Sequence, residues 1–250
     1  MKITEKSNDL HIMKVEMTCD KKICNKKGQH VAYPLMCSSH LYLISGPSGS
    51  GKTNLILSLL RSTKKTADGN LFSYKKCFDN VVFVSPSSKT IKGNILENLD
   101  DDKKYQHLDF DVFEKVDELT EDAIEEDKHT LLILDDVSSE LRKSKPLTTQ
   151  LNILCKNRRH KNLSIWIISH KIIDMDPALR NNASLIFLFK PKNGKEIDIV
   201  RNEFLNINIT DLRELMSYIY KTKHDFMLID QTLRKDGDFI IFKNFNQIDF

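Results

Sequence analysis

The residues that decide the fold are Leu41-Tyr42-Leu43-Ile44-Ser45-Gly46-Pro47-Ser48-Gly49-Ser50-Gly51-Lys52-Thr53. They begin with a short apolar run, which is typical of a strand buried on both faces of a parallel sheet. After a glycine-containing loop, apolar residues recur at helical spacing, at Leu55, Ile56, Leu59 and Leu60. The stretch therefore predicts a strand, a loop and a helix that starts near Lys52.

The loop has the composition of a nucleotide-phosphate site. Its three glycines let backbone N–H groups turn inward toward an anion, and the following helix adds the positive end of its dipole. Lys52 is expected to reach the β- and γ-phosphates, and the Thr53 hydroxyl to ligate Mg²⁺. We therefore predict binding of ATP with Mg²⁺ by Gly46, Pro47, Ser48, Gly49, Ser50, Gly51, Lys52 and Thr53.

Four more short apolar runs follow, each too short for a helix and each ending in polar residues. They cover residues 81–84, 131–134, 164–168 and 185–189. Strands separated by helical segments predict an α/β fold with a central parallel sheet, whose ligands gather at the carboxyl ends of the strands.

Two of these strand ends carry candidate catalytic groups. Asp135 and Asp136 close the run at 131–134, where Asp135 is expected to hold Mg²⁺ and Asp136 to orient or deprotonate the attacking water. His170 closes the run at 164–168, where P-loop ATPases with an extra strand between the loop strand and the acidic strand place a γ-phosphate sensor. A histidine satisfied by its own loop is the alternative reading.

Length and composition limit the class of protein. A chain of 250 residues that is 40% hydrophobic can bury one substantial core. It contains no apolar run of membrane-spanning length and no secretory signal at its start. The five cysteines favour free thiols in a reducing compartment, and a zinc site built from Cys19, Cys24, Cys37, His11 and His30 is disfavoured by their spacing.

Charge is unevenly distributed. Residues 97–127 contain 14 acidic residues and three lysines, whereas the rest of the chain contains 35 basic and 21 acidic residues. The basic part is compatible with a polyanion such as DNA and equally with a solvated surface. The acidic part is read as a mobile insertion. Lys143, Lys145 and Lys192 are candidate DNA contacts that nothing distinguishes from ordinary surface lysines.

Three regions are expected along the chain. Residues 1–38 are an irregular lead-in, and residues 39–192 form the P-loop core. Residues 193–250 should pack on this core as two short helices, the second capped by Thr210, and a hairpin that turns at Asp236-Gly237.

Behind the P-loop, four segments occur in a fixed order: Val82-Phe83-Val84-Ser85-Pro86-Ser87, Leu134-Asp135-Asp136, Asn157-Arg158-Arg159-His160-Lys161-Asn162-Leu163-Ser164 and Pro177-Ala178-Leu179-Arg180-Asn181-Asn182-Ala183. In this arrangement, over residues 40–192, the chain resembles the poxvirus-type virion DNA-packaging ATPases of large DNA viruses and virophages, within the FtsK/HerA superfamily. Two positions depart from the wider group, which often has Gln where this chain has His170 and Glu where it has Asp136.

The resemblance implies a motor that hydrolyses ATP and moves double-stranded DNA into a preformed capsid. It further implies a ring of identical copies, pentameric or hexameric, with capsid or portal-like partners, in the virion or the cytoplasmic virus factory. The implied sheet order is 5-1-4-3-2, with the strands numbered along the chain.

Three arginines are candidates for completing the site from a neighbouring subunit. Arg180 precedes the fifth strand and is expected at the nucleotide edge of the sheet, whereas Arg158 and Arg159 precede the fourth strand at the opposite edge. A guanidinium that stabilises the charge of the transferred phosphoryl group contributes about 10³–10⁵ in turnover. A surface role remains the alternative for each.

Other functions stay open. A helicase or another P-loop DNA-dependent ATPase shares the same motifs, and a nucleotide-gated virion assembly protein is the alternative from a different class. The chain lacks the Asn-Lys-x-Asp motif of GTPases and the Leu-Ser-Gly-Gly signature of ABC transporters.

Overall fold

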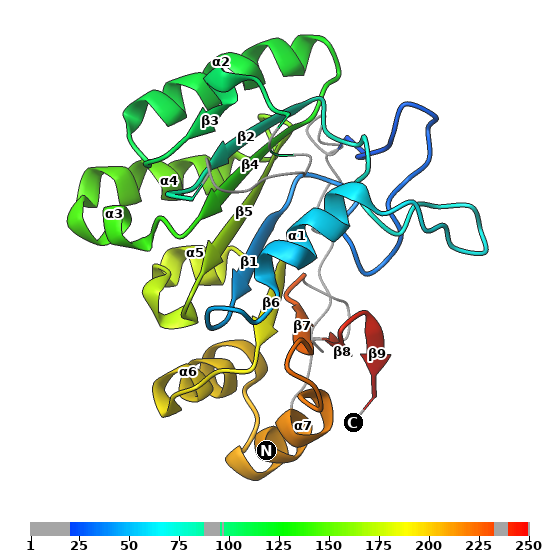
Figure 1. Cartoon of the computed structure of the whole chain (residues 1–250), viewed down its shortest axis with the longest axis vertical. Coiled ribbons are helices and arrows are strands. Elements are labelled where there is room, and N and C mark those ends of the chain that lie inside the picture. Colours follow the sequence, from blue (N-terminus) through cyan, green and yellow to red (C-terminus); the bar gives the residue numbers. More distant parts are fainter. Residues whose placement is uncertain (1–20, 88–95, 97, 233–239, 250) are drawn as a thin grey trace, which may run out of the picture.

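The computed structural model describes residues 21–87, 96, 98–232 and 240–249. Its centre is a single nine-stranded sheet in the order β3-β2-β4-β5-β1-β6-β7-β8-β9 (Figure 1). In chain order, the strands are β1 Leu41–Ser45, β2 Asn80–Val84, β3 Lys104–Tyr105, β4 Thr130–Asp135, β5 Leu163–Ser169, β6 Leu185–Phe189, β7 Phe226–Asp230, β8 Ile240–Lys243 and β9 Asn246–Ile248.

The five strands expected from the sequence lie side by side as β2-β4-β5-β1-β6, which is the implied 5-1-4-3-2 order read from the other edge. All pairings from β3 through β6 are parallel, and those from β6 through β9 are antiparallel. The sheet is therefore longer than expected, because β3 extends one edge and three C-terminal strands extend the other.

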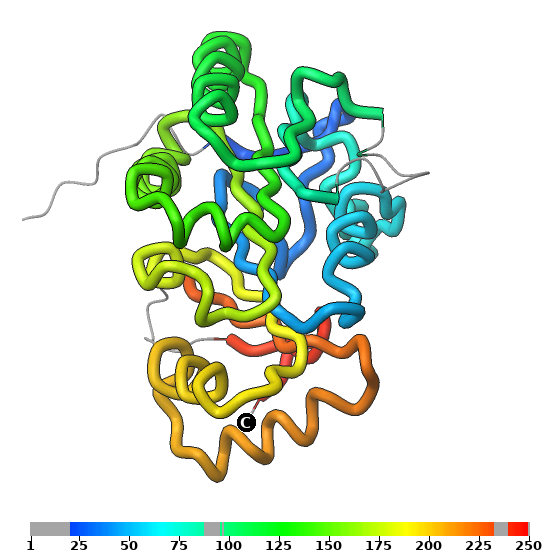
Figure 2. The backbone as a smooth tube through the Cα atoms, turned by 60° about the vertical axis from the view of Figure 1, so that its left-hand side comes forward, coloured from blue at the N-terminus to red at the C-terminus, as the bar shows by residue number. Residues whose placement is uncertain are grey.

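Helices cover both faces of the sheet. They are α1 Lys52–Arg61, α2 Phe110–Glu125, α3 Ser138–Lys143, α4 Lys145–Asn157, α5 Pro177–Asn181, α6 Gly194–Ile199 and α7 Ile209–Ile219, with the 3₁₀ turns η1 Asp101–Lys103 and η2 Ile172–Asp174 and the π-helical η3 Val200–Leu205. Figure 2 shows α1 on one side of the sheet and α2, α4, α5 and α6 on the other.

Alternation along β1 divides the core into two layers. Leu41 and Leu43 join the buried cluster beneath α2, α4, α5 and α7. Tyr42 and Ile44 join the cluster that contains the buried face of α1 and residues of the 21–37 segment. Because successive strand residues point to opposite faces, an uninterrupted apolar run supplies both layers at once.

The acidic segment is ordered where the structure describes it, so the expected mobile insertion is wrong there. Most of its second half forms α2. The Asp109 side chain caps the N-terminus of this helix by accepting a hydrogen bond from the Val112 N–H. Val112, Val116 and Ala123 are buried against the sheet, while the acidic residues face outward. Half of the acidic residues of 97–127, seven of 14, therefore form the solvated face of an amphipathic helix.

The C-terminal region has the expected helices and hairpin, with two differences. Asn208, rather than Thr210, caps α7 by accepting from the Asp211 N–H. The strands β7 and β8 pair antiparallel as predicted, but they continue the main sheet instead of packing on it. The turn at Asp236-Gly237 and the lead-in up to residue 20 lie outside the described residues.

In the part of the chain that the structure describes, no helix is long and apolar enough to cross a membrane. Nor do these residues form a group of three or more metal-binding side chains of the His, Cys, Asp and Glu types. Cys24, Cys37, Cys77 and Cys155 are free thiols, whereas His11 and Cys19 lie outside the described range.

Candidate nucleotide site

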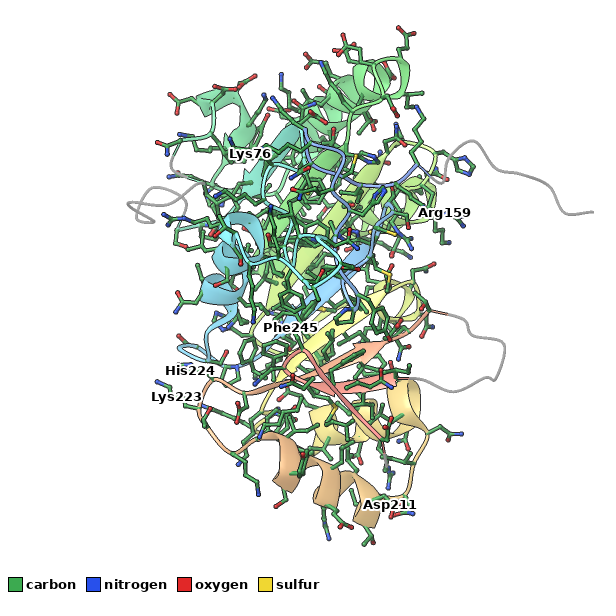
Figure 3. All side chains as sticks on the ribbon, turned by 90° about the vertical axis from the view of Figure 1, so that its right-hand side faces the viewer. Lys76, Arg159, Asp211, Lys223, His224 and Phe245 are labelled. Carbon is green, nitrogen blue, oxygen red and sulfur yellow. The ribbon has the colours of Figure 1, made fainter. Side chains whose placement is uncertain are left out.

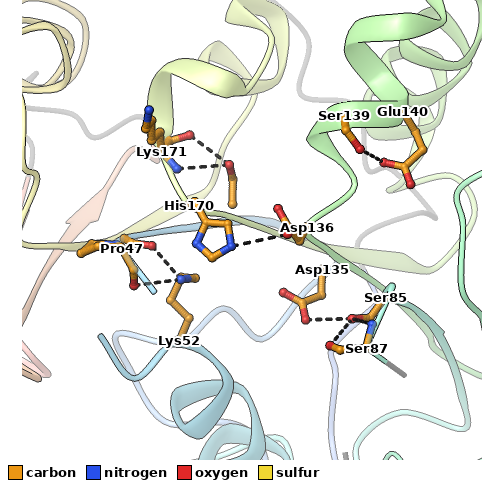
Figure 4. A network of polar contacts seen from close by, with 12 residues as sticks. Pro47, Lys52, Ser85, Ser87, Asp135, Asp136, Ser139, Glu140, His170 and Lys171 are labelled. Atoms are coloured by element: carbon orange, nitrogen blue, oxygen red, sulfur yellow. Dashed lines mark hydrogen bonds and ion pairs between the residues drawn. The ribbon is translucent and has the colours of Figure 1, made fainter. Parts of the chain in front are cut away.

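The register of three parallel strands brings the predicted site residues together. Ser45 at the end of β1 is opposite Ser169 at the end of β5, and Asp135 at the end of β4 is opposite Ile168. The residues that leave these strands, Gly46, Asp136 and His170, consequently start from one level of the carboxyl edge. Figure 4 shows Lys52, Asp135, Asp136 and His170 grouped there.

The loop conformation explains its glycines. Gly49 and Gly51 have φ of 72° and 113°, in the region that side chains larger than hydrogen disfavour, and Gly51 is the residue from which α1 begins. At Gly46, an added Cβ would lie 2.5 Å from the Cβ of Phe189 on β6. The loop is thus packed directly against the neighbouring strand, and any side chain at Gly46 would displace it.

Lys52 is held inside the loop. Its side chain lies in the first turn of α1, is 8% exposed, and Nζ donates to the carbonyls of Gly46 at 2.6 Å and Pro47 at 3.1 Å (Figure 4). Burial lowers the pKa of Lys52, while the carboxylates of Asp135 and Asp136 act in the opposite direction. The ammonium is therefore directed at the loop's interior, where phosphate oxygens would lie.

Asp135 is fixed by the neighbouring strand. The Ser85 hydroxyl, just past the end of β2, donates to Asp135 Oδ2 at 3.1 Å and lies 3.0 Å from the Ser87 hydroxyl. Burial raises the pKa of Asp135, and the Ser85 hydrogen bond and the positive charge of Lys52 oppose this effect. Ser85, itself hydrogen-bonded to Ser87, therefore orients the carboxylate and favours its charged form.

Asp136 and His170 lie side by side at the cavity (Figure 4). Asp136 has a φ of 57°, and its N–H donates to the Ile168 carbonyl at 3.1 Å. His170 Nε2 lies 3.4 Å from Asp136 Oδ2, and both side chains are about half exposed. The positive φ of Asp136 thus directs the chain out of β4, and its side chain lies on the solvent-accessible side of the site.

These residues line one cavity of ≈ 360 Å³. Its walls are Ser48, Gly49, Gly51, Lys52, Thr53, Asn54, Ser87, Asp135, Asp136, His170 and His224. Two larger surface hollows, of ≈ 600 and ≈ 810 Å³, lie over α6, α7 and β9 and contain none of these residues. The chemistry, rather than the size, identifies the smaller cavity as the candidate site.

The donor set fits a nucleotide with Mg²⁺. The Thr53 hydroxyl and the Asp135 carboxylate line the same cavity, and oxygen ligands of these two kinds are those that Mg²⁺ uses beside nucleotide phosphates. Lys52 and the N-terminus of α1 supply the positive potential for the phosphates themselves.

Three lining residues were not foreseen as site residues. Ser87 follows a predicted strand end, so the rule that ligands gather at the carboxyl edge contained a signal for it. Asn54 directly follows the loop. His224 lies 174 residues from its contact at Ser50, and no local pattern pointed to it.

Arg180 does not occupy the position expected of it. It lies in α5, is 6% exposed, and its guanidinium donates to both carboxylate oxygens of Glu203 at 2.7 and 2.9 Å and to the Met175 carbonyl at 2.6 Å. Residues just before β6 bond to the start of β1, since the Ser184 N–H donates to the Leu41 carbonyl, so α5 leads to the edge opposite the nucleotide loop. The burial of the guanidinium and its three hydrogen bonds within the chain argue against a role for Arg180 in a neighbouring site.

Arg158 and Arg159 lie at the edge opposite the P-loop, as expected from their place before β5. Arg158 is half-buried at the end of α4, where Nη1 donates to the Cys155 carbonyl at 2.6 Å. Arg159 is exposed (Figure 3). Neither side chain lines the nucleotide cavity of its own chain.

The fold and the loop define the class of the protein as a P-loop ATPase. Similar solved structures include the DNA-packaging ATPase B204 of Sulfolobus turreted icosahedral virus, at 16% identity and a TM-score of 0.54 over 83% of this chain and 98% of that one. The genome packaging NTPase B204 of Sulfolobus turreted icosahedral virus 2, in complex with ATP-gammaS, matches over the same shares at 16% identity and a TM-score of 0.53. The cytoplasmic domain of the type VII secretion ATPase EccC of Thermomonospora curvata matches at 13% identity and a TM-score of 0.54, over 90% of this chain and 28% of that one.

The sequence itself identifies the family. The family described as poxvirus A32 protein matches residues 34–243, which is most of the chain. The chain belongs to the poxvirus A32 protein family. A search of curated proteins finds no match.

Proposed function

We propose that the protein is an ATP-hydrolysing motor that moves double-stranded viral DNA into preformed capsids. The observation that carries the proposal is the meeting of Lys52, Asp135 and Asp136 at one cavity in a chain of the A32 family. The similar structures named for genome and DNA packaging support it through their shared fold.

Each site residue has a defined task in this proposal. The loop from Gly46 to Thr53 binds the phosphates, with Lys52 on their terminal oxygens. Thr53 and Asp135 would hold Mg²⁺, which neutralises phosphate charge when bound. Asp136 orients the attacking water and accepts its proton, and His170, within 3.4 Å of Asp136, links the γ-phosphate position to that carboxylate.

The assembly that fits this function is a ring of identical chains, pentameric or hexameric, around duplex DNA. Arg158 or Arg159 then completes the nucleotide site of the next subunit from the opposite edge of the sheet. Contact with DNA is expected to involve backbone phosphates, which makes it sensitive to salt and tolerant of sequence. Capsid or portal-like proteins are the expected docking partners, in the virion or the cytoplasmic virus factory.

DNA-stimulated ATP turnover tests the proposal. The wild-type chain should hydrolyse ATP, with strong stimulation by long duplex DNA, and Lys52→Ala and Asp135→Ala should abolish both the basal and the stimulated rate. Stimulation by single strands alone would instead favour a helicase. ATP binding without turnover under any of these conditions would favour a nucleotide-gated assembly protein.

A further inference from the structure

The C-terminal part of the chain reaches the nucleotide site through His224. This residue lies in the turn between α7 and β7, and its ring is one wall of the cavity that contains Lys52 and His170. Figure 3 shows Lys223 and His224 together beside the start of α1. None of the sequence motifs at the P-loop, the acidic strand or the sensor position includes this turn.

One ring nitrogen of His224 already forms a hydrogen bond with the loop. Nδ1 lies 2.9 Å from the backbone carbonyl of Ser50. A carbonyl oxygen only accepts hydrogen bonds, so Nδ1 carries a hydrogen and donates it. The ring also lies beside Gly51, where an added Cβ would be 3.3 Å from the same nitrogen. His224 therefore holds the crest of the P-loop by its backbone.

The turn that carries His224 is anchored on both sides. The Tyr220 hydroxyl at the end of α7 donates to the Leu188 carbonyl of β6 at 3.0 Å, and the Thr222 N–H donates to Asp225 Oδ2 at 2.6 Å. Phe226, two residues after His224, pairs with Phe189 in the sheet, and Phe189 is the residue packed on Gly46. The loop is thus supported at Gly46 by β6 and at Ser50 by the turn before β7.

Charge at this wall suits an anion. The Lys223 ammonium lies 3.8 Å from the position that a Cβ of Gly49 would take, beside the loop's crest. With Nδ1 donating to Ser50, the polar atom of His224 left for a ligand is Nε2, which only accepts in the neutral ring. The form that donates from Nε2 to a phosphate oxygen is therefore the imidazolium, which carries a hydrogen on both nitrogens. Donors to phosphate oxygens form charge-assisted hydrogen bonds, which are stronger than neutral ones.

We propose that His224 is a nucleotide-binding residue supplied in cis by the C-terminal segment, which fixes the P-loop through Ser50 and donates from Nε2 to the polyphosphate. The proposal rests on nucleotide binding at the P-loop, and it assigns residues 193–250 a part in the active site rather than only in the packing of the sheet edge. Nucleotide occupancy and the position of the α7–β7 turn are then coupled.

Equilibrium binding of ATPγS and AMP to the full-length chain tests this assignment. His224→Ala should weaken ATPγS binding about tenfold or more, as loss of a hydrogen bond to a charged group does, and AMP binding less than about twofold. His224→Asn retains an N–H near the position of Nδ1 but has no counterpart of Nε2. It should therefore still weaken ATPγS binding severalfold, by no more than His224→Ala does, because only the bond to Ser50 is kept.

The control is Lys221→Ala, an exposed residue of the same turn that does not line the cavity, which should bind both nucleotides as the wild type does. Wild-type affinity for ATPγS in His224→Ala would overturn the proposal. So would full rescue by His224→Asn, or an equal loss for AMP, since either result leaves only a structural role. Melting temperatures near the wild-type value in all three variants exclude misfolding as the cause.

A second measurement needs no variant. On addition of ATPγS to the wild-type chain, the amide protons of residues 222–226 should exchange more slowly, and unchanged exchange there would contradict the coupling. These results can be told apart from the packaging proposal. If the chain binds ATPγS but DNA does not stimulate its ATPase activity, the motor proposal fails. The comparison of ATPγS binding among the variants still decides the role of His224.

Discussion

The hydroxyl of Ser85 donates to the carboxylate of Asp135 at 3.1 Å, across the boundary between two neighbouring strands of the sheet. This bond counters the burial that raises the pKa of Asp135. A protonated carboxyl group is a poor ligand for Mg²⁺, so activity should increase with pH as Asp135 loses its proton.

Replacement of Ser85 should therefore affect the pH dependence of ATP hydrolysis. In Ser85→Ala, the carboxylate loses a stabilising donor, the pKa of Asp135 rises further, and the acidic limb of the kcat/KM profile moves to higher pH. A loss of about tenfold in kcat/KM is expected on the acidic limb, from one hydrogen bond to a charged group. The check is a set of steady-state rates from pH 5 to 8, with Ser217→Ala, an exposed serine that does not line the nucleotide cavity, as the control. A profile that only decreases in height, with its acidic limb in place, would contradict this role of Ser85.

Arg180 should contribute to stability rather than to a neighbouring site. Its buried guanidinium makes two hydrogen bonds to Glu203 and one to the Met175 carbonyl. Arg180→Ala removes the packing of a buried side chain and the hydrogen bond to the Met175 carbonyl, and should lower the free energy of unfolding by about 2 kcal/mol. Urea denaturation measures this, and Glu203→Gln should be less harmful because it retains an acceptor.

A mixture of Arg180→Ala with Lys52→Ala chains provides the functional side of the same test. If Arg180 acts only in stability, the Arg180→Ala chain keeps its own nucleotide site. Adding Lys52→Ala chains should then give no more ATPase activity than the folded Arg180→Ala chains have alone. If the mixture gains ATPase activity and Arg180→Ala is as stable as the wild type, Arg180 would again be a candidate for the arginine that acts in a neighbouring subunit's site.

The sequence predicted the residues around the loop because their chemistry is local. Gly46 to Thr53 are adjacent, and the ends of β1, β4 and β5 meet because parallel strands in register end at one edge. Asp135, Asp136 and His170 could therefore be assigned to one cavity from strand ends alone.

What the sequence did not reveal depends on contacts between distant residues. No sequence pattern indicates that Glu203 pairs with Arg180, because the two residues are far apart in the chain. The sequence alone therefore leaves Arg180 among the arginines that could act in a neighbouring site. In α2, the apolar spacing of Val112, Val116 and Ala123 was hidden by the density of acidic residues on the exposed face. His224 reaches Ser50 only because β7 continues the main sheet beside β6, which local patterns do not specify.

Arg159 is the exposed arginine at the edge opposite the nucleotide loop, and it is the better placed of the two remaining candidates. Arg159→Ala should fold with wild-type stability and bind ATPγS normally, but lose about 10³-fold or more in turnover if its guanidinium stabilises the transferred phosphoryl group. Mixed with Lys52→Ala, it should regain part of the ATPase activity, since some interfaces then combine an intact loop with an intact arginine.

The matched control for that mixture combines Lys52→Ala with Asp135→Ala, whose defects lie in the same site and should not complement. Equal recovery of ATPase activity in both mixtures would show that the recovery does not come from a nucleotide site shared between subunits. No recovery with Arg159→Ala, together with full activity of that variant alone, would exclude Arg159 and leave Arg158.

His40 makes the stability of the protein depend on pH. It is buried between strands, stacks on Tyr42, and its Nε2 accepts a hydrogen bond from Trp166 Nε1 at 3.0 Å. Burial lowers the pKa of His40 from 6.5 to about 3. In the unfolded chain the imidazole gains a proton below about pH 6.5, whereas in the folded protein it stays neutral, so the unfolded state binds more protons and stability decreases as pH falls from 6.5 toward 3.

Between pH 7 and pH 5 this single group should cost about 2 kcal/mol of unfolding free energy. Urea denaturation followed by the fluorescence of Trp166, the only tryptophan of the chain, measures the change at the contact itself. His40→Gln should be less stable at pH 7 but should lose less stability on acidification, whereas the exposed control His107→Gln should follow the wild type. The same loss between pH 7 and pH 5 in His40→Gln as in the wild type would assign the acid sensitivity to other groups, of which His129, whose pKa burial also lowers, is the next to replace.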